Sequence, residues 1–400
     1  MSTATLSGTG VKLLTGNAAA AFGAMLCSPD VVAAYPITPQ TEVIEKLSQF
    51  HAEGDLDAEM INVEGENSAM NAVTAASLAG GRVFTATSSW GLVFMYDAVL
   101  ATAGARAPVV MVNVNRETPG IIAVSSGQQD MISTRDCGWI FLVAENCQEI
   151  LDQVIIAYRL AEDHGIQLPV MVHYDGFYLS YMAERVEVPE KRMVKSYLSI
   201  LDSQPRRPAL LPGKGLGCGS HGIMGGYLEL RRKHLNALMR SKEILKEAED
   251  EFARIFQRSY PGAVEEYRAA DADTVLVGSG SMCGTIRTVV DVMRDQGRRV
   301  GMVKIRMYRP FPAAELVSSL KGKKSAGVVD RSVCFGFEGG PIFNEVASLS
   351  GKFPETGLLS FIDGIANTDI TKENIEEMFT RLIEMSKGGA VDTVNWMAEE

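Results

Sequence analysis

A short turn bounded by prolines contains the first residue that could bind a ligand. Residues 34–39 read Ala-Tyr-Pro-Ile-Thr-Pro, and the two prolines fix the backbone around Thr38 and exclude regular structure there. Because an apolar run at 31–34 comes directly before this turn, the hydroxyl of Thr38 could be held toward a ligand. The same pattern also fits an ordinary strand-to-helix turn in which Thr38 is a helix N-cap.

Candidate acid–base residues and a cation lie in two later segments. Residues 63–69 read Val-Glu-Gly-Glu-Asn-Ser-Ala, and residues 112–116 read Val-Asn-Val-Asn-Arg. Glu66 opens a predicted helix, where the helix dipole favours a negative charge and a carboxyl group could take part in acid–base catalysis. Arg116 offers a planar fork of donors that suits a carboxylate better than lysine does.

The first half of the chain predicts elements that bring these residues to one place. Short apolar runs alternate with helical patterns, which indicates an α/β fold with a doubly wound, mostly parallel sheet. The expected strands are 31–34, 60–63, 83–86, 109–113, 140–143 and 169–173, and the expected helices are 16–26, 40–50, 66–78, 91–103 and 147–163. Ligands of such sheets bind outside the carboxyl ends of the strands. The polar residues that follow directly after predicted strands are Thr38, Glu64, Glu66, Ser88, Ser89 and Arg116.

The second half predicts another, smaller α/β unit. A Gly/Pro-rich loop is expected from 205 to 222, and a charged helix from 227 to 256 is interpreted as a solvated or partner-covered linker helix. The strands expected after it are 274–277, 300–306, 326–330 and 358–362, with a helix that runs to 293. We therefore predict a first domain at 1–195, a loop and helical linker at 196–270, and a second domain at 271–395.

Several classes of function do not fit the composition. The chain has 400 residues, of which 46% are hydrophobic and 22% charged, and its net charge of −11 argues against a nucleic-acid partner. No apolar run approaches the roughly 20 residues that span a bilayer, and the N-terminus lacks a secretory pattern. The six cysteines form no Cys-x-x-Cys pair and the five histidines are dispersed, so we expect no cluster and no metal site in this chain. A cytoplasmic location without membrane contact is expected.

Taken together, the three segments around Thr38, Glu66 and Arg116 resemble the 2-oxoacid:ferredoxin oxidoreductases. The resemblance is to the α subunit, which carries the pyrimidine-binding domain for thiamine diphosphate. In the second half, residues 309–312 (Arg-Pro-Phe-Pro) and 337–341 (Phe-Glu-Gly-Gly-Pro) resemble the transketolase C-terminal-like domain of the same family. The glycines at 278–281 (Gly-Ser-Gly-Ser) are a poor match to a dinucleotide-binding loop, because the third glycine is missing.

The resemblance implies roles for individual residues. Glu66 matches the family's catalytic glutamate, which hydrogen-bonds N1′ of the aminopyrimidine and so promotes proton loss from the thiazolium. Glu64, two residues earlier, could be confused with it, but the spacing to the Ser-Ser-Trp-Gly turn at 88–91 favours Glu66. Arg116 would take the carboxylate of the 2-oxoacid, and Thr38 its carboxylate or keto oxygen. The remaining cofactor-binding candidates implied by the match are Pro36, Ser88, Ser89 and Gly91.

One departure from the family concerns the substrate. Pyruvate enzymes commonly show Asn-Ile-Trp-Gly-Asp at the mouth of the pocket, where this chain has Ala-Val-Ser-Ser-Gly at 123–127. Ser125 and Ser126 would leave room for a bulkier 2-oxoacid, such as an aromatic one, unless Trp90 or Trp139 refills the space. A second departure is Asp-Gly-Ile-Ala-Asn at 363–367, where the family often has Gly-Leu-Gly-Gly; it weakens any inference about contacts near that loop.

The function implied by the resemblance is oxidative decarboxylation of a 2-oxoacid with transfer of the acyl group to coenzyme A. Thiamine diphosphate would be shared with a β subunit that also holds its Mg²⁺, because this chain has no Gly-Asp-Gly…Asn pattern. Electrons would pass to [4Fe-4S] clusters on partner subunits, namely the β subunit and ferredoxin-like and γ subunits. The substrate could be phenylglyoxylate or pyruvate. A pyruvate-specific ferredoxin oxidoreductase subunit, a non-redox transketolase-like subunit and a silent scaffold remain as alternatives.

Overall fold

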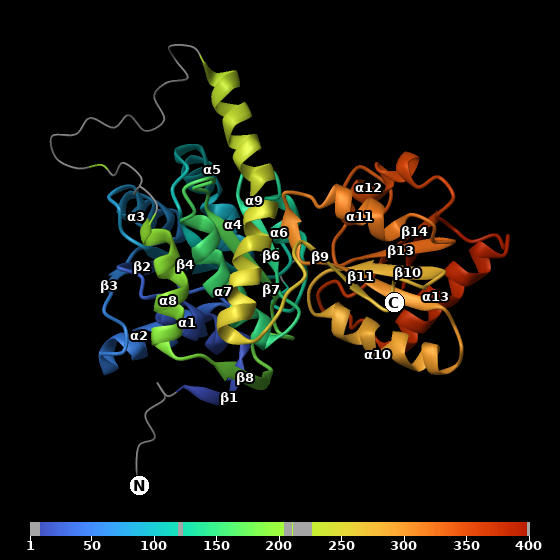
Figure 1. The fold of residues 1–400 in the computed structure, drawn as a ribbon, viewed down its shortest axis with the longest axis horizontal. Coiled ribbons are helices and arrows are strands. Elements are labelled where there is room, and N and C mark those ends of the chain that lie inside the picture. Colours follow the sequence, from blue (N-terminus) through green and yellow to red (C-terminus); the bar gives the residue numbers. More distant parts are fainter. Residues whose placement is uncertain (1–8, 119–122, 204–209, 211–225, 398–400) are drawn as a thin grey trace, which may run out of the picture.

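The structure is a computed structural model that describes residues 9–118, 123–203, 210 and 226–397. Its described residues form two α/β units that lie side by side, with the N-terminal half in one and most of the C-terminal third in the other (Figure 1). The predicted α/β fold, with mostly parallel sheets in two units, is confirmed. The Gly/Pro-rich loop expected from 205 to 222 lies outside the described residues, apart from Leu210.

The first unit is built on a seven-stranded sheet. Its strands run in the order β12 (Met307–Arg309), β6 (Ile140–Val143), β7 (Val170–Asp175), β5 (Val110–Asn115), β4 (Val83–Thr87), β2 (Val31–Ala34) and β3 (Glu59–Asn62). Only β12 is antiparallel to its neighbour, so six of the carboxyl ends point to the same edge. A separate antiparallel ribbon pairs β1 (Gly10–Thr15) with β8 (Ala183–Val188).

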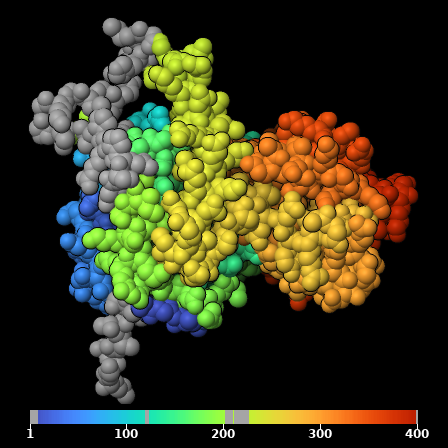
Figure 2. Space-filling model, viewed as in Figure 1, coloured from blue at the N-terminus to red at the C-terminus, as the bar shows by residue number. Residues whose placement is uncertain are grey.

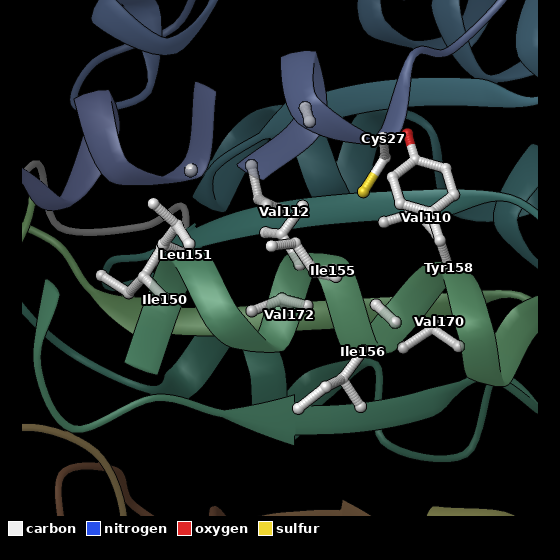
Figure 3. Close-up of a cluster of buried hydrophobic side chains, with 14 of the residues drawn as sticks. Cys27, Val110, Val112, Ile150, Leu151, Ile155, Ile156, Tyr158, Val170 and Val172 are labelled. Carbon is white, nitrogen blue, oxygen red and sulfur yellow. The ribbon is translucent and has the colours of Figure 1, made fainter. Parts of the chain in front are cut away.

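Helices cover both faces of this sheet because its strands are apolar on both sides. One face packs against α1 (Gly16–Cys27), α2 (Thr41–Glu53), α7 (Cys147–Ala161), α8 (Lys191–Leu198) and α9 (Tyr227–Phe256). The other packs against α3 (Glu66–Leu78), α4 (Ser89–Phe94), α5 (Tyr96–Ala105) and α6 (Gln129–Ser133). In Figure 3, Ile155 of α7 lies over Val112 of β5 and Val172 of β7, which shows how the branched side chains interlock at the centre of the core.

The second unit has six strands between two helical layers. Their order is β15 (Val394–Trp396), β14 (Gly357–Ile362), β13 (Ser325–Asp330), β10 (Thr274–Gly278), β11 (Val300–Ile305) and β9 (Val264–Tyr267), of which β9 is antiparallel. On one face lie α10 (Met282–Asp295) and α13 (Lys372–Ser386), and on the other α11 (Ala313–Leu320) and α12 (Pro341–Ala347) (Figure 1). Two 3₁₀ turns at Ser199–Ser203 and Ser350–Lys352 complete the elements.

Two features differ from the sequence-based expectation. The single helix expected at 91–103 is wrong: the chain forms α4 and α5, which meet at Met95, where ψ is 8° and the helix is interrupted. The charged helix α9 has the expected bounds, yet Ile244, Leu245 and Phe252 are buried in the core of the first unit. Figure 2 shows α9 lying across that unit, beside the second one.

The two units exchange edge strands. β9 falls in the segment predicted as a linker and joins the second sheet, whereas β12 falls in the segment predicted as the second domain and joins the first sheet. The two sheets are therefore not separated at residues 195 and 270. The domain boundaries at these residues stay a proposal. Within the described residues, no helix is long and apolar enough to cross a membrane.

Candidate functional site

Polar side chains occupy the carboxyl end of the first sheet on the face that packs against α3, α4 and α5. In β5, Asn113 and Asn115 alternate with Val112 and Val114, and since successive side chains point to opposite faces, the two asparagines share one face. The parallel register places Thr87 and His173 beside Asn113, and Asp175 beside Asn115. We call this buried row the polar edge; it consists of Thr87, Asn113, Asn115, His173 and Asp175.

Glu66 is the first residue of α3, and its carboxylate lies inside the protein. The residue is 7% exposed, and no side-chain hydrogen bond to it is present among the described residues. A Cβ atom at position 91 would lie 2.7 Å from Glu66 Oε1, so only glycine leaves this carboxylate room. The structure thus brings Glu66 and Gly91 into direct contact.

Glu64 occupies a different environment from Glu66. It is exposed, and Ser68 Oγ donates a 2.6 Å hydrogen bond to its Oε1. This hydrogen bond holds the pKa of the Glu64 carboxyl below its ordinary value. Glu64 is thus a solvated, already paired residue, whereas Glu66 is a buried acid with free acceptor capacity.

Ser88 and Ser89 form the turn between β4 and α4 and fix it through their hydroxyls. Ser88 Oγ donates to the carbonyl of Val114 at 2.7 Å, and the Ser89 hydroxyl donates to the carbonyl of Glu117. Ser89 has a φ of 40°, a left-handed backbone that non-glycine residues adopt at a cost and that occurs mostly where surrounding contacts enforce it. These serines shape the turn that carries Gly91, and both are fully buried.

Arg116 and Thr38 are brought together, although they are distant in sequence. Arg116 Nη1 donates a 2.9 Å hydrogen bond to the carbonyl of Thr38, and Arg116 Nε donates to the carbonyl of Ala123. Burial lowers the pKa of Arg116, and the nearby Asp130 opposes that shift.

The turn before α2 leaves the Thr38 side chain free of a capping role. Helix α2 begins at Thr41 with Gln40 at the N-cap position, so the interpretation of Thr38 as an N-cap is wrong. The side chains of Thr38 and Pro36 are both exposed, and the next proline, Pro39, follows a cis peptide bond.

Ser125 and Ser126 face the second unit. Ser125 Oγ donates to Asn367 Oδ1 at 2.6 Å, and Arg331 Nη1 donates to Ser126 Oγ at 2.8 Å. Both serines are buried, so any pocket they line is closed on that side by the loops after β13 and β14. The loop that we predicted to shape the substrate pocket is therefore held by contacts between the two units.

The two tryptophans near this region lie in different surroundings. Trp139 is fully buried in the core and donates its indole N–H to the carbonyl of Val99 at 2.8 Å, so it does not refill a substrate pocket. Trp90 is 45% exposed on α4, one residue before Gly91. Of the two candidates, only Trp90 lies at the surface next to the site.

Asp130 and Glu117 are two acids of the site that sequence reasoning did not single out. Burial raises the pKa of Asp130 to about 7, against hydrogen bonds from Asn113, Ser89, Met131 and Arg116 that lower it. Burial also raises the pKa of Glu117 to about 7, and Asp130 adds to this shift. A usable signal was the alternation of asparagine with valine in β5, because buried amides need polar partners.

The Gly-Ser-Gly-Ser loop at 278–281 contacts the first unit. Ser281 donates from its backbone N–H (2.8 Å) and its hydroxyl (2.6 Å) to Asp175 Oδ2 at the end of β7. A Cβ atom at Gly280 would lie 2.8 Å from the same oxygen, which explains the glycine. Gln128 Nε2 donates to Asp175 Oδ1 at 3.0 Å, so the segment that follows Ser126 is bound to the same carboxylate.

Comparisons with known proteins show which family the chain is similar to over most of its length. The family model "Pyruvate flavodoxin/ferredoxin oxidoreductase, thiamine diP-bdg" matches residues 22–250, and "Pyruvate:ferredoxin oxidoreductase core domain II" matches residues 272–375. The pyruvate synthase subunit PorA of Methanothermobacter thermautotrophicus is 42% identical, over 93% of this chain and 95% of its own length. The α subunit of the NADH-dependent phenylglyoxylate dehydrogenase of Aromatoleum evansii is 34% identical, over 98% and 95%.

A solved structure shares the fold. The 2-oxoglutarate:ferredoxin oxidoreductase of Magnetococcus marinus, solved with 2-oxoglutarate, coenzyme A and succinyl-CoA bound, superposes with a TM-score of 0.67. It is 19% identical and covers 94% of this chain, whereas this chain spans 66% of that one. At this identity the likeness concerns the fold alone.

Proposed function

We propose that this chain, which belongs to the pyruvate flavodoxin/ferredoxin oxidoreductase family, is the α subunit of a thiamine diphosphate-dependent 2-oxoacid oxidoreductase. The proposed reaction is the oxidative decarboxylation of a 2-oxoacid, with the acyl group passed to coenzyme A and the electrons passed to iron–sulfur clusters. Its curated relatives are subunits of oxidoreductases that act on pyruvate, phenylglyoxylate and ketoisovalerate, as their names state.

The observation that carries this proposal is the Glu66–Gly91 contact. Glu66 is largely buried and its carboxylate accepts no hydrogen bond among the described residues, so a ligand that offers a donor could pair with it. Thiamine diphosphate fits this arrangement, since its protonated aminopyrimidine is such a donor, and the cofactor would supply the nucleophilic carbon that attacks the keto group. Glu66 would hold or release a proton at the ring nitrogen, and Gly91 leaves the carboxylate the space it needs.

Arg116 and Thr38 would bind the substrate. The guanidinium of Arg116 already lies against the Thr38 turn, and within the described residues its direct partners are the backbone carbonyls of Thr38 and Ala123. A carboxylate that approached this corner would meet a fork of donors and the exposed hydroxyl of Thr38. The two residues would thereby hold the 2-oxoacid by its carboxylate.

Partner subunits complete the proposed site. Exposed apolar side chains gather on α4 beside Gly91, namely Trp90, Val93 and Phe94, and such residues are typical of a protein interface. We propose that a β subunit covers them and binds the diphosphate and Mg²⁺. The [4Fe-4S] clusters would lie on the β subunit and on ferredoxin-like and γ subunits. A cytoplasmic location, expected from the sequence, is part of the same proposal.

The substrate is proposed to be a 2-oxoacid bulkier than pyruvate, with phenylglyoxylate as the leading candidate. The small side chains of Ser125 and Ser126 support this proposal, and the relative with the phenylglyoxylate substrate is consistent with it. Pyruvate is the alternative, supported by the pyruvate synthase subunits among the relatives. Comparing kcat/KM for the two acids decides the matter: a tenfold preference for pyruvate, about 1.4 kcal/mol, would reject the bulkier substrate.

The proposed function is tested with the complex purified together with its partner subunits. A 2-oxoacid plus coenzyme A should bleach the cluster absorbance and yield the acyl-CoA, whereas the chain expressed alone should fold and show no turnover. A colourless active complex that transfers two-carbon units would instead indicate a transketolase-like enzyme. A complex without any turnover would leave only a docking role for the chain.

A further inference from the structure

Asp130, at the start of α6, touches three separate parts of the candidate site with a single side chain. Its Oδ2 accepts hydrogen bonds from the backbone N–H of Ser89 (3.1 Å), from Asn113 Nδ2 (2.9 Å) and from the backbone N–H of Arg116 (3.2 Å). Its Oδ1 accepts from the backbone N–H of Met131 (2.8 Å). The residue is fully buried, so these four donors replace all of its hydration.

Two of these donors belong to different segments of the site, which Asp130 joins through one oxygen. Ser89 starts the turn that carries Gly91, the residue in contact with the Glu66 carboxylate. Arg116 starts the loop whose guanidinium reaches the Thr38 turn. One oxygen atom therefore joins the part of the site next to Glu66 to the part that would bind the substrate.

The backbone of Ser89 shows why such an anchor is needed. Its left-handed conformation, with φ at 40°, is unfavourable for a non-glycine residue and persists only where surrounding contacts enforce it. The N–H of Ser89 is directed at Asp130, while its hydroxyl donates to the carbonyl of Glu117, one residue after Arg116. Both contacts of Ser89 lead to the same loop.

We infer that Asp130 is a positioning residue that holds the Ser88–Gly91 turn and the Arg116 loop in one register, so that Glu66 and Arg116 face the same ligand space. This inference rests on the proposed function for what the ligand is, but the register itself is a property of the chain alone. Asp130 does not touch the proposed ligand in this view; it acts through Ser89 and Arg116.

The matched control is Asp330, at the end of β13. It is equally buried and accepts two backbone N–H groups, from Ile342 (2.8 Å) and Phe343 (3.1 Å), at the start of α12. Removing either carboxylate should destabilise the fold to a comparable extent. Only Asp130 should alter the site.

The experiment compares Asp130→Ala, Asp130→Asn and Asp330→Ala. In the isolated full chain, Asp130→Ala should speed hydrogen exchange at least tenfold in peptides that cover 86–95 and 113–118, whereas Asp330→Ala should not. In the complex with its partner subunits, Asp130→Ala should raise both the Kd for thiamine diphosphate and the KM for the 2-oxoacid at least tenfold. Asp330→Ala should leave both constants within twofold of the wild type.

Asparagine keeps the volume of Asp130, but it has one acceptor oxygen in place of two and so can accept hydrogen bonds from the donors on one side only. Asp130→Asn should therefore raise the hydrogen-exchange rate, the Kd and the KM by about three- to tenfold. If Asp130→Ala does not fold, Asp130→Asn is compared with Asp330→Ala in its place. Unchanged exchange and unchanged constants in the Asp130 variants, or equal changes in Asp330→Ala, would overturn the inference. If the wild-type complex turns over no 2-oxoacid, the proposed function fails, while the exchange experiment still decides the role of Asp130.

Discussion

Two buried polar regions of this molecule differ in how completely their side chains are hydrogen-bonded. The first is the polar edge, where Thr87 Oγ1, Asn113 Oδ1, Asn115 Nδ2 and His173 Nε2 have no hydrogen-bond partner among the described residues. The second, which we call the ionic joint, consists of Glu145, Glu149, Glu249, Lys304 and Arg306. No side-chain atom of the ionic joint is left unpaired within the described chain.

The ionic joint connects the two units through dense pairing. Lys304 Nζ lies 2.7 Å from Glu145 and 2.9 Å from Glu149, and Arg306 contacts Glu149 at 3.1 Å and Glu249 at 2.6 Å. The acids belong to β6–α7 and to α9, whereas the bases lie on β11 and directly after it. Buried charges are tolerated only when they are paired in this way.

The difference shows that the polar edge, unlike the ionic joint, contains groups that lower the free energy of unfolding. Unpaired buried polar atoms cost about 1–3 kcal/mol each, and a fold that only needed a joint would have paired them as the ionic joint does. The polar edge keeps them at the carboxyl ends of the strands, where α/β sheets bind ligands. The comparison thus contrasts a fully paired region between the two units with a partly unpaired one at the carboxyl ends of the strands, where we propose that the ligand binds, and variants in the two should lose different properties.

The largest expected effect is on chemistry, at Glu66. Glu66→Gln keeps a hydrogen-bond partner of similar shape but cannot exchange a proton, so turnover and C2–H exchange of the bound cofactor should fall by roughly 10²–10⁴-fold. NMR after acid quench in D₂O measures the exchange. Glu64→Gln is the matched control, because Glu64 is exposed and paired with Ser68, and it should keep much of the activity. Loss at Glu64 alone would move the catalytic assignment two residues upstream.

The largest expected effect on stability lies in the ionic joint. Lys304→Met leaves Glu149 with Arg306 and Glu145 with Arg287, so each acid loses one of its two cations. The change should cost about 3 kcal/mol of unfolding free energy, while kcat of the remaining folded complex is unchanged. Urea denaturation of the isolated chain measures the loss. Lys242→Met is the control, since it removes a more exposed pair with Glu315 between α9 and α11 and should cost about 1 kcal/mol or less. Equal losses of unfolding free energy in the two variants would mean that the ionic joint contributes no more stability than the Lys242–Glu315 pair.

Arg116→Lys should impair the reaction with the substrate and leave the stability provided by the ionic joint unchanged. The charge stays but the fork of donors is lost, so kcat/KM for the 2-oxoacid should fall by an amount equal to about 2–4 kcal/mol, with little change in cofactor affinity. Steady-state kinetics of the complex and cofactor titration separate the two. Normal kinetics in this variant would show that Arg116 does not bind the substrate carboxylate.

The parts of the site that sequence could predict are those encoded locally. Glu66 at the start of α3, Gly91 after the two serines and Arg116 directly after β5 can each be read from a few neighbouring residues; the structure places Gly91 against Glu66, and their roles in a site stay predictions. Asp130 could not be read in this way, because the groups it binds lie 14 to 41 residues away and its own neighbours predict only a short helix.

The same limit applies to the fold. Alternating apolar strands and helices predicted both sheets, since each element carries its own periodicity. The exchange of β9 and β12 between the sheets was not predictable, because edge pairing depends on contacts between distant segments. The helix break at Met95 was missed for a similar reason: the residues around it fit a single helix, and tertiary packing imposes two.

Gly91→Ala should produce a smaller, local effect. Its Cβ would lie 2.4 Å from Thr87 Oγ1 and 2.7 Å from Glu66 Oε1, so the turn or the carboxylate must move, at a cost of about 1–3 kcal/mol. Activity should fall more than stability, because the displaced group is the proposed acid–base residue. Gly104→Ala, with open space around the added Cβ, is the matched control and should be close to neutral in both. A lower melting temperature without a lower kcat would show that Gly91 has no role in the site.

The smallest expected effect is a difference in pH dependence between the two regions. Burial raises the pKa of Asp130 to about 7, so the native state keeps a proton that the unfolded chain has lost, and stability falls as pH rises from about 4 to 7. Glu149 behaves oppositely: burial raises its pKa, but Lys304 and Arg306 outweigh this and lower it to about 2, so its contribution is lost only below about pH 4. Between pH 5 and pH 8, the stability of Asp130→Asn relative to the wild type should therefore improve by about 2–3 kcal/mol, since one pKa unit corresponds to about 1.36 kcal/mol. The relative stability of Glu149→Gln should stay constant over the same range. Melting temperatures of both variants at the two pH values provide the measurement, and a parallel trend in the two would show that both regions hold their charges in the same way.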